Sequence, residues 1–357
     1  MRTKIILLFA FIFALTINST FAQGCEGDVP ATADGGVPTT SSLNVFGYIQ
    51  PQYNTYFTDQ GENTFNFKRA RLGVYGRANR SFSYYVVLEA SAFIGGGDAY
   101  LLDAFVSYDK HEWAKVSLGS FKQPFGREVT TACHSLTTID RAIVSDQLVA
   151  PQRDMGLMFL GGSSKTKLQY ALAVMNGRGL GVKDNNKKKD IIGRASYQFL
   201  DFLNVGASFR YGYPNFDEDN ASNPKEDDHI RKTVGVDASV TYKALTVQGE
   251  YIYDEGDYNR AAGGGCGSEP LELGDIRHGA YIMASYDVNE KLQPVFKYEY
   301  FDQDADIKEN GYQERMTFGV NYFFSPKVRL QINYQANIET YVNVDNDALL
   351  MQMQVRF

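Results

Sequence analysis

The chain has 357 residues, of which only 22% are charged and 14% are aromatic, and its formal net charge is −7. This composition excludes a disordered chain, and the negative charge argues against nucleic acid as a partner. Three Cys and four His are too few for a disulfide scaffold or a cage of metal ligands, so we expect no metal ion and no cofactor.

Residues 1–22 have the pattern of a secretory signal peptide. Arg2 and Lys4 form a short positive region, and the apolar stretch Ile5–Ile17 follows it. The stretch Thr20–Ala22 then places small residues at the positions that precede a cleavage site. We therefore expect an exported protein.

A lipoprotein signal at Cys25 is the alternative, but the aliphatic residue that normally stands three positions before such a Cys is missing. We predict a flexible segment at 23–42, followed by one folded domain at 43–357. No apolar run after residue 22 is long enough for a transmembrane helix.

The folded domain alternates apolar and polar positions, which is the two-residue period of a strand with two different faces. In the segment 327–340 the two sets are Val328, Leu330, Ile332 and Tyr334 against Arg329, Gln331, Asn333 and Gln335. In chain order, we predict sixteen strands at 43–57, 64–78, 81–94, 98–109, 111–121, 154–162, 166–176, 190–199, 203–213, 232–242, 244–254, 275–288, 291–301, 313–324, 327–340 and 347–357.

The predicted connections alternate between tight turns and long loops, and a soluble β-sandwich has no reason for this alternation. An outer-membrane β-barrel does, because its periplasmic turns are short, its outer loops are long and its strand number is even. Closing the sheet also removes unpaired edges, and a barrel of sixteen strands leaves an aqueous lumen. We therefore predict an all-β, sixteen-stranded antiparallel transmembrane barrel.

Several stretches resemble the phosphate-selective porin O and P family: Phe67–Arg77, Leu101–Tyr108, Gly119–Gly126 and Asp140–Phe159. The terminal Phe357 is similar to the C-terminal aromatic residue of outer-membrane barrels. The resemblance implies a porin of the Gram-negative outer membrane that assembles as a homotrimer and has a third loop folded inward. Motif-level similarity is confined to roughly the first third of the domain. The resemblance supports a porin strongly and phosphate as the solute only weakly, since many relatives in the broad family have no demonstrated phosphate preference.

Acidic residues are concentrated in three long loops, at 214–230, 254–275 and 302–310, which hold 16 acidic and 3 basic residues together. The rest of the chain has 32 basic and 26 acidic residues, a net charge of +6, or +4 without the signal peptide. Fixed charges act most strongly inside a pore. We therefore expect a preference for small anionic solutes such as phosphate.

Basic residues at the polar positions of the strands should point into the lumen. These candidates for anion binding at the wall are Arg69, Arg71, Lys115, Arg194, Arg210, Lys297 and Arg329. The alternative is that each is paired with a lumen acid: a hairpin near residue 80 would bring Arg71 close to Glu89, and Lys297 neighbours Glu299 on the same face.

The long loop 122–153 differs from the acidic ones, with four basic and three acidic residues. Its stretch Ala142–Ala150 is too apolar to stay in water, so we expect the loop to fold into the lumen as a constriction. Arg side chains offer paired donors that suit phosphate and carboxylate oxygens. The candidates for anion binding in this loop are Lys122, Arg127, Arg141 and Arg153; the alternative is that they only tie the loop to the wall.

An enzyme is disfavoured, because Cys133–His134 is the only neighbouring pair of a nucleophile and a base, and adjacency in sequence does not make a dyad. A non-conducting surface barrel, whose acidic outer loops bind a partner or divalent cations, remains the alternative to a channel. Besides anionic solutes and further copies of the chain, we expect outer-membrane lipid as a partner. A disulfide between Cys133 and Cys266 is a further hypothesis.

Overall fold

The computed structural model describes residues 42–58, 63–163, 165–181, 183–184, 187–213, 230–257, 273–307, 312–338 and 346–357. The predicted signal peptide and all of the predicted flexible segment except Ser42 lie outside the described residues. Among the described residues, no helix is long and apolar enough to span a membrane.

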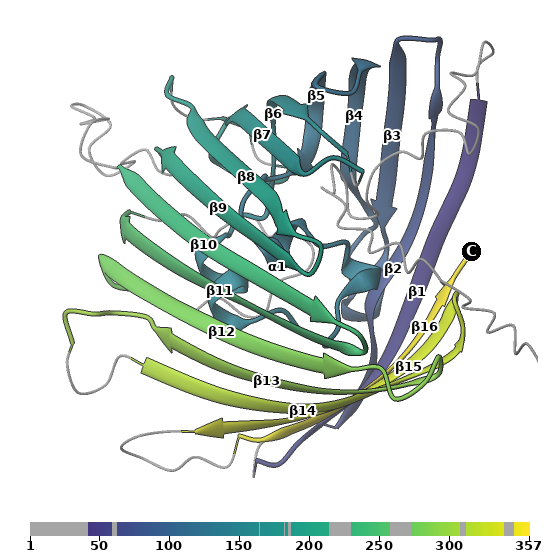
Figure 1. Ribbon diagram of the computed structural model, residues 1–357, viewed down its shortest axis with the longest axis vertical. Helices are drawn as coiled ribbons and strands as arrows, with labels where there is room; N and C mark the ends of the chain where they lie inside the picture. The colour runs from purple at the N-terminus through teal and green to yellow at the C-terminus, as the bar shows by residue number, and fades with distance from the viewer. Residues whose placement is uncertain are drawn as a thin grey trace, which may run out of the picture.

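Sixteen antiparallel strands form one closed barrel, in which each strand pairs with the next and β16 pairs with β1 (Figure 1). The predicted fold class is therefore confirmed. The strands are β1 (Ser42–Tyr56), β2 (Thr64–Arg77), β3 (Phe82–Glu89), β4 (Tyr100–His111), β5 (Ala114–Lys122), β6 (Arg153–Gly161), β7 (Leu168–Met175), β8 (Asp190–Leu200), β9 (Leu203–Gly212), β10 (Arg231–Tyr242), β11 (Leu245–Gly256), β12 (Ile276–Tyr286), β13 (Leu292–Asp302), β14 (Tyr312–Ser325), β15 (Val328–Ile338) and β16 (Ala348–Arg356).

The largest difference from the predicted strand bounds is at β3, which was expected to reach residue 94. It ends at Glu89, and a 3-10 helix, η1 (Ser91–Gly95), follows. The carboxylate of Glu89 accepts the backbone N–H groups of Ala70, at 2.9 Å, and Ser91, at 3.0 Å. This side chain satisfies the backbone at the point where the chain leaves the sheet.

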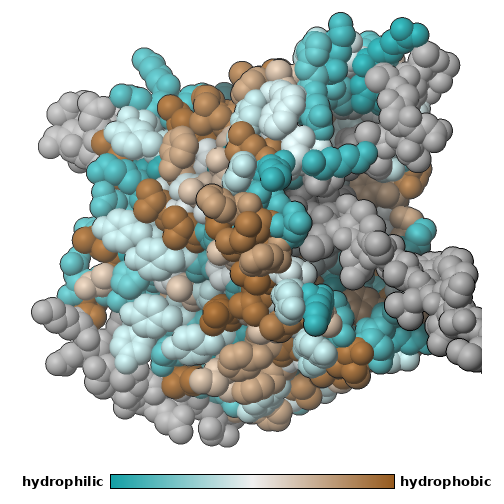
Figure 2. Space-filling view, in the orientation of Figure 1, coloured by the Kyte–Doolittle hydropathy of each residue, from teal (hydrophilic) through white to brown (hydrophobic). Residues whose placement is uncertain are grey.

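The two faces of each strand differ as the period predicts. On β10, Val234 and Val236 are 53% and 56% exposed, whereas Thr233 and Asp237 on the other face are buried. Figure 2 shows apolar side chains gathered over the middle of the outer face formed by the strands nearest the viewer. An outward apolar band around a closed sheet is what a surrounding bilayer requires.

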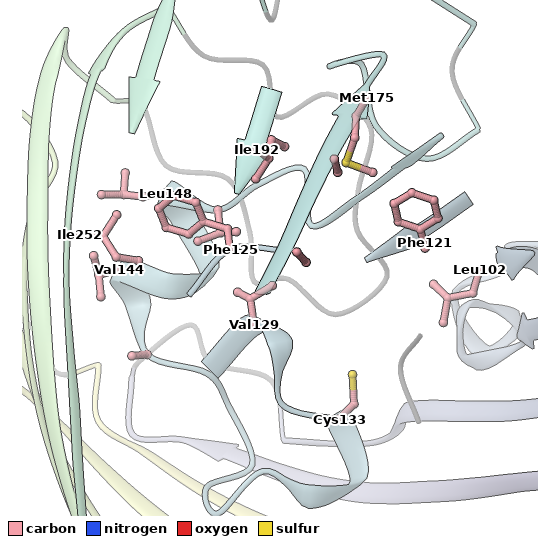
Figure 3. Packing of buried hydrophobic residues seen from close by; sticks show 14 of the residues in the cluster. Leu102, Phe121, Phe125, Val129, Cys133, Val144, Leu148, Met175, Ile192 and Ile252 are labelled. Carbon is pink, nitrogen blue, oxygen red and sulfur yellow. The ribbon is translucent and has the colours of Figure 1, made fainter. Parts of the chain in front are cut away.

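The connection between β5 and β6 lies inside the barrel (Figure 1). It contains α1 (Arg127–Thr130), the 3-10 helix η2 (Cys133–Ser135) and α2 (Ile143–Leu148). The apolar face of α2 packs on the inner side of β11, β12 and β13. Figure 3 shows Val144 and Leu148 of α2 close to Ile252 of β11.

The inner wall is less polar than the alternation in the sequence suggested. Buried apolar and aromatic side chains line the inner faces of β3 to β8, among them Tyr85, Phe105, Phe121, Met158 and Ile192. They belong to the same buried cluster as the apolar residues of the inner connection. The lumen therefore holds a packed core on one side.

The seam between β1 and β16 depends on Gly47. Gly47 and Phe357 exchange two backbone hydrogen bonds, of 3.3 and 3.0 Å. A Cβ atom on Gly47 would lie 2.5 Å from the carbonyl oxygen of Arg71 and 2.6 Å from the Phe357 ring. Both neighbouring strands therefore approach too closely for a side chain here.

We predict that Gly47→Val lowers the free energy of unfolding by about 1–3 kcal/mol, the usual cost of forcing atoms into a packed contact. Denaturant unfolding in detergent micelles measures this. The control is Ala195→Val, at an exposed outward position on β8. Equal unfolding midpoints for both variants would contradict the role of the seam.

Candidate functional site

Two wall glutamates hold the N-terminal ends of the helices inside the lumen. Glu250 of β11 accepts the backbone N–H of Arg127 at 3.0 Å and that of Glu128 at 3.3 Å, the first residues of α1. Glu299 of β13 accepts the N–H of Ile143, the first residue of α2, at 2.8 Å. The first N–H groups of a helix have no partner within it, so the wall supplies the missing acceptors.

Two wall arginines hold the carbonyl groups that follow α2. Arg231 donates to the carbonyl oxygens of Leu148, at 2.6 Å, and Ala150, at 2.7 Å. Arg210 donates to the carbonyl oxygen of Val149, at 3.2 Å. The last carbonyl groups of a helix also lack intrahelical partners, and cationic donors suit them.

Asp254 fixes the orientation of Arg231 and of another wall arginine, Arg277. Its carboxylate accepts hydrogen bonds from Arg231, at 2.9 Å, and Arg277, at 2.6 Å, and all three side chains are buried. The assignment of Asp254 to the acidic residues of an outer loop was wrong. Asp254 faces inward near the end of β11, because the strand extends to Gly256.

The middle of the connection lies against a wall rich in amide side chains. Arg329 donates to the carbonyl oxygens of His134, at 3.1 Å, and Leu136, at 3.0 Å. Asn321 donates to the carbonyl oxygen of Thr137 at 3.0 Å, and Asn333 accepts the N–H of Ile139 at 2.8 Å. Amides can both donate and accept, so they suit an extended backbone that offers both kinds of group.

Three of the four basic residues predicted to bind anions in the loop are buried: Lys122, Arg141 and Arg153. Lys122 and Arg153 lie opposite each other at the ends of β5 and β6, so the connection itself is residues 123–152. The ammonium group of Lys122 donates to the carbonyl oxygen of Thr131 at 3.1 Å. Arg153 pairs with Asp103 at 3.0 Å, with both side chains inaccessible.

The other two basic residues of the loop also have protein partners. Arg141 donates to the carbonyl oxygens of Glu128, at 3.1 Å, and Thr131, at 3.3 Å. Arg127 pairs with Asp237 at 2.8 Å, and its side chain keeps 13% of its exposure. Lys122 and Arg127 therefore tie the loop to the wall, whereas Arg141 joins two parts of the loop and Arg153 pairs within the wall. Binding of anions by these four residues stays a prediction.

Among the wall residues, the two ion pairs considered from the sequence are present. Arg71 lies 2.6 Å from Glu89, and Lys297 lies 3.3 Å from Glu299. The other predicted wall residues also contact protein groups. Arg194 pairs with Asp237, and Arg69 donates to Gln50 at 2.8 Å. Lys115 lies 3.5 Å from the carbonyl oxygen of Gly162, and Arg210 and Arg329 donate to carbonyl oxygens of the loop.

Three further basic residues that contact the loop or its wall partners were not predicted from the sequence: Lys68, Arg231 and Arg277. The last two stand at inward positions of strands whose period was recognised, so the alternation itself was the available signal. Lys68 breaks the alternation of β2, and it lies 2.5 Å from Asp140 of the loop. Its partner is more than seventy residues away in sequence, and no local pattern indicates it.

Two carboxylates of the loop have shifted pKa values. Burial opposes ionisation of Asp140, but the charges of Lys68 and Arg315 and the hydrogen bonds from Lys68 and Gln335 together outweigh it and hold the pKa of Asp140 well below its usual range. The ionised Asp140 carboxylate stabilises the docked loop at pH values above the ordinary pKa of an aspartate. This stabilisation is lost as the pH falls through the lowered pKa of Asp140. Burial raises the pKa of Glu128, although the positive charge of Lys297 acts to lower it. Protonated Glu128 therefore stabilises the docked loop at low pH, and this stabilisation is lost as the pH rises.

Together these contacts hold an irregular segment inside the barrel. Within the described ranges, no group of three or more His, Cys, Asp or Glu is placed to hold a metal ion. Cys133 is buried, with its sulfur 3.5 Å from a nitrogen of Arg141. The disulfide to Cys266 stays a prediction, because Cys266 lies outside the described residues.

We predict that Glu250→Ala loosens α1, because the N–H groups of Arg127 and Glu128 lose their acceptor. An unsatisfied buried group costs about 1–3 kcal/mol, so hydrogen exchange in this segment should speed up by about one to two orders of magnitude. Hydrogen-exchange mass spectrometry of peptides from 123–152 measures it. The control is Glu255→Ala on the same strand, where Glu255 pairs with Lys232; equal rates in both variants would contradict the clamp.

Comparison with known proteins finds a family model, described as phosphate-selective porin O and P, that matches residues 44–357. No curated protein matches the chain. Among solved structures, the fold is similar to an anion-selective porin from Comamonas acidovorans, with 14% identity, a TM-score of 0.61 and coverage of 88% of this chain and 99% of that one.

Two further porin-like structures are as similar. The trimer form of OmpT, an outer membrane protein of Vibrio cholerae, has 13% identity and a TM-score of 0.61, and covers 89% of this chain and 100% of its own. OmpF of Salmonella typhi, in complex with daunomycin, has 12% identity and a TM-score of 0.61, with coverage of 88% and 97%. At these identities the likeness shows the fold, whereas the family match spans nearly the whole barrel: the chain belongs to the phosphate-selective porin O and P family, and is a porin of the Gram-negative outer membrane.

Proposed function

We propose that this porin, a water-filled channel for passive diffusion of small hydrophilic solutes, prefers anions, phosphate among them. The observation that carries the proposal is positive charge without a counter-charge. Within the part of the chain that the structure describes, Arg329 forms no salt bridge; its hydrogen-bond partners are the carbonyl oxygens of His134 and Leu136 and the amide oxygen of Gln354. Such dipoles hold a guanidinium group in place but leave its net charge to act on the lumen.

Other basic residues contribute less to this field, because a carboxylate stands beside them. Arg71, Arg153 and Arg194 each have such a partner. In the loop, Arg127 shares Asp237 with Arg194, and the Glu250 carboxylate lies beside this group. The side chain of Arg127 keeps part of its exposure, which supports a weaker role in attracting anions at the point where the loop meets the wall.

The name of the porin from Comamonas acidovorans, anion-selective, agrees with the proposal, and the family description names phosphate. The family and the channel geometry support a passive function rather than a catalytic one. The trimer form of OmpT supports assembly of this chain as a homotrimer. None of the described contacts favours the non-conducting surface barrel.

Planar-bilayer recording separates a channel from a non-conducting barrel. We expect stepwise single-channel conductance from the purified protein, in groups of three if the assembly is a trimer, and a reduced chloride current when phosphate is added. Light scattering gives the mass of the assembly independently. Absence of conductance from a folded protein would overturn the channel.

We predict that Arg329→Gln lowers the anion-over-cation permeability ratio by up to about fivefold, the effect of about 1 kcal/mol for a partly screened charge. Gln keeps an amide donor for the carbonyl oxygen of Leu136 but removes the charge. Reversal potentials in a salt gradient measure the ratio.

Two controls accompany this variant. Arg329→Lys keeps the charge and should keep the preference. Lys232→Gln removes an exposed charge from the outer face of β10 and should change the ratio little, because salt screens it over about 8–10 Å. If Arg329→Gln and Lys232→Gln give the same reversal potential, the lumen charge does not set the preference.

A further inference from the structure

The outer wall of the barrel has a groove of about 580 Å³ on β10, β11 and β12. It opens where three small residues come together: Ala238, Gly249 and Ala280. Ala238 is paired directly with Gly249 across the β10–β11 ladder, and Ala280 is paired with Tyr251, the next outward residue of β11. The lining is mostly apolar.

The groove faces away from the lumen. Its flanking side chains Val236, Tyr251 and Ile282 are 56%, 42% and 53% exposed. The residues between them point the other way: Asp237 pairs with Arg194, and Glu250 holds α1. These strands lie on the side of the barrel that Figures 1 and 2 turn toward the viewer. The surroundings of the groove are therefore those of the outer apolar band, not of the channel.

The depth of the groove follows from the strand register. Lys232, the outward residue at the start of β10, has an exposed ammonium group paired with Glu255, which also accepts the hydroxyl of Tyr253. Such polar and aromatic groups mark the membrane–water interface. Ala238 is six residues further, about 20 Å along the strand. A tilt of about 45° reduces this to about 14 Å of depth.

The exposed Tyr242 ends the same strand only four residues beyond Ala238, about 9 Å of depth by the same measure, and Lys243 follows it in the turn. The groove therefore lies nearer the periplasmic interface than the outer one.

The width of the groove restricts what can enter. Tyr251 and Val247 flank Gly249 on the same face of β11, so the opening along this strand is a single residue position wide. A helix with its side chains is about 10–12 Å across and does not fit into such an opening. An extended hydrocarbon chain does.

We propose that this groove binds an acyl chain of a lipid in the inner leaflet, with its head group at the level of Tyr242 and Lys243. In a bilayer, neighbouring hydrocarbon already surrounds the wall, so the gain comes from packing contacts rather than from removal of water. A chain lying between Tyr251, Val247 and Ile282 contacts protein on several sides, whereas a lipid on a flat strand surface contacts it on one. The site depends on the barrel and its membrane location, not on solute selectivity.

Native mass spectrometry of the full-length mature protein in detergent tests the proposal. Dipalmitoyl phosphatidylcholine is the long-chain probe, and dihexanoyl phosphatidylcholine, whose chains are too short to reach from the interface to Gly249, is the comparison. We expect a protein–lipid adduct that survives collisional activation with the long-chain probe and not with the short-chain one.

Two substitutions fill the groove from its sides: Ala238→Leu and Ala280→Leu. Each alone should weaken the adduct, and the double variant should lose it. The matched control Ala195→Leu, at an exposed outward position on β8, should retain it. Circular dichroism and single-channel conductance of every variant show that the barrel is folded, so a lost adduct is not a failure to fold.

Three outcomes would overturn the proposal. Retention of the adduct by the double variant would place the lipid elsewhere, and equal loss in the Ala195→Leu control would mean unspecific adhesion. If the groove-filling variants instead change the oligomeric mass and the wild-type protein carries no lipid, the occupant is a second copy of this chain. A loss of anion preference without loss of the adduct would affect the proposed function alone.

Discussion

The whole interior of this barrel depends on satisfying the backbone of one irregular segment inside a closed sheet. Residues 123–152 form only short helices, so most of their N–H and carbonyl groups cannot pair with each other. A buried group without a partner costs free energy, and a strand ladder already uses the backbone of the wall. Wall side chains therefore supply the partners: Glu250 and Glu299 accept, Arg231 and Arg329 donate.

This requirement explains why charged side chains are buried in the lumen at all. A guanidinium group that holds two carbonyl oxygens is both a structural tie and a fixed positive charge. Where a carboxylate stands beside it, as Asp254 does for Arg231, the charge is partly offset and the tie remains. Where only dipoles stand beside it, as at Arg329, the charge has no such offset. In the function proposed above, the same side chains set both the structure and the selectivity.

The two faces of the wall follow different rules. Inside, polar groups need explicit partners, and apolar residues such as Phe121 and Ile192 are buried because the connection fills part of the lumen. Outside, the bilayer covers apolar side chains of any shape, so small residues cost little there. That tolerance allows Ala238 and Gly249 to leave a groove that a flat wall would not have.

The sequence by itself determined the number of strands, the sides on which their residues lie and the closed barrel, because a two-residue period is a local property. It also indicated the pairs Arg71–Glu89 and Lys297–Glu299, since the first spans one short hairpin and the second one strand face. Only the tertiary structure decided which wall side chains meet the inner segment. Glu250 reaches Arg127 over 123 positions and Arg329 reaches Leu136 over 193, distances at which no sequence pattern carries information about contact. Closure of the barrel brings them together, and for this reason the roles of its arginines become visible only in the fold.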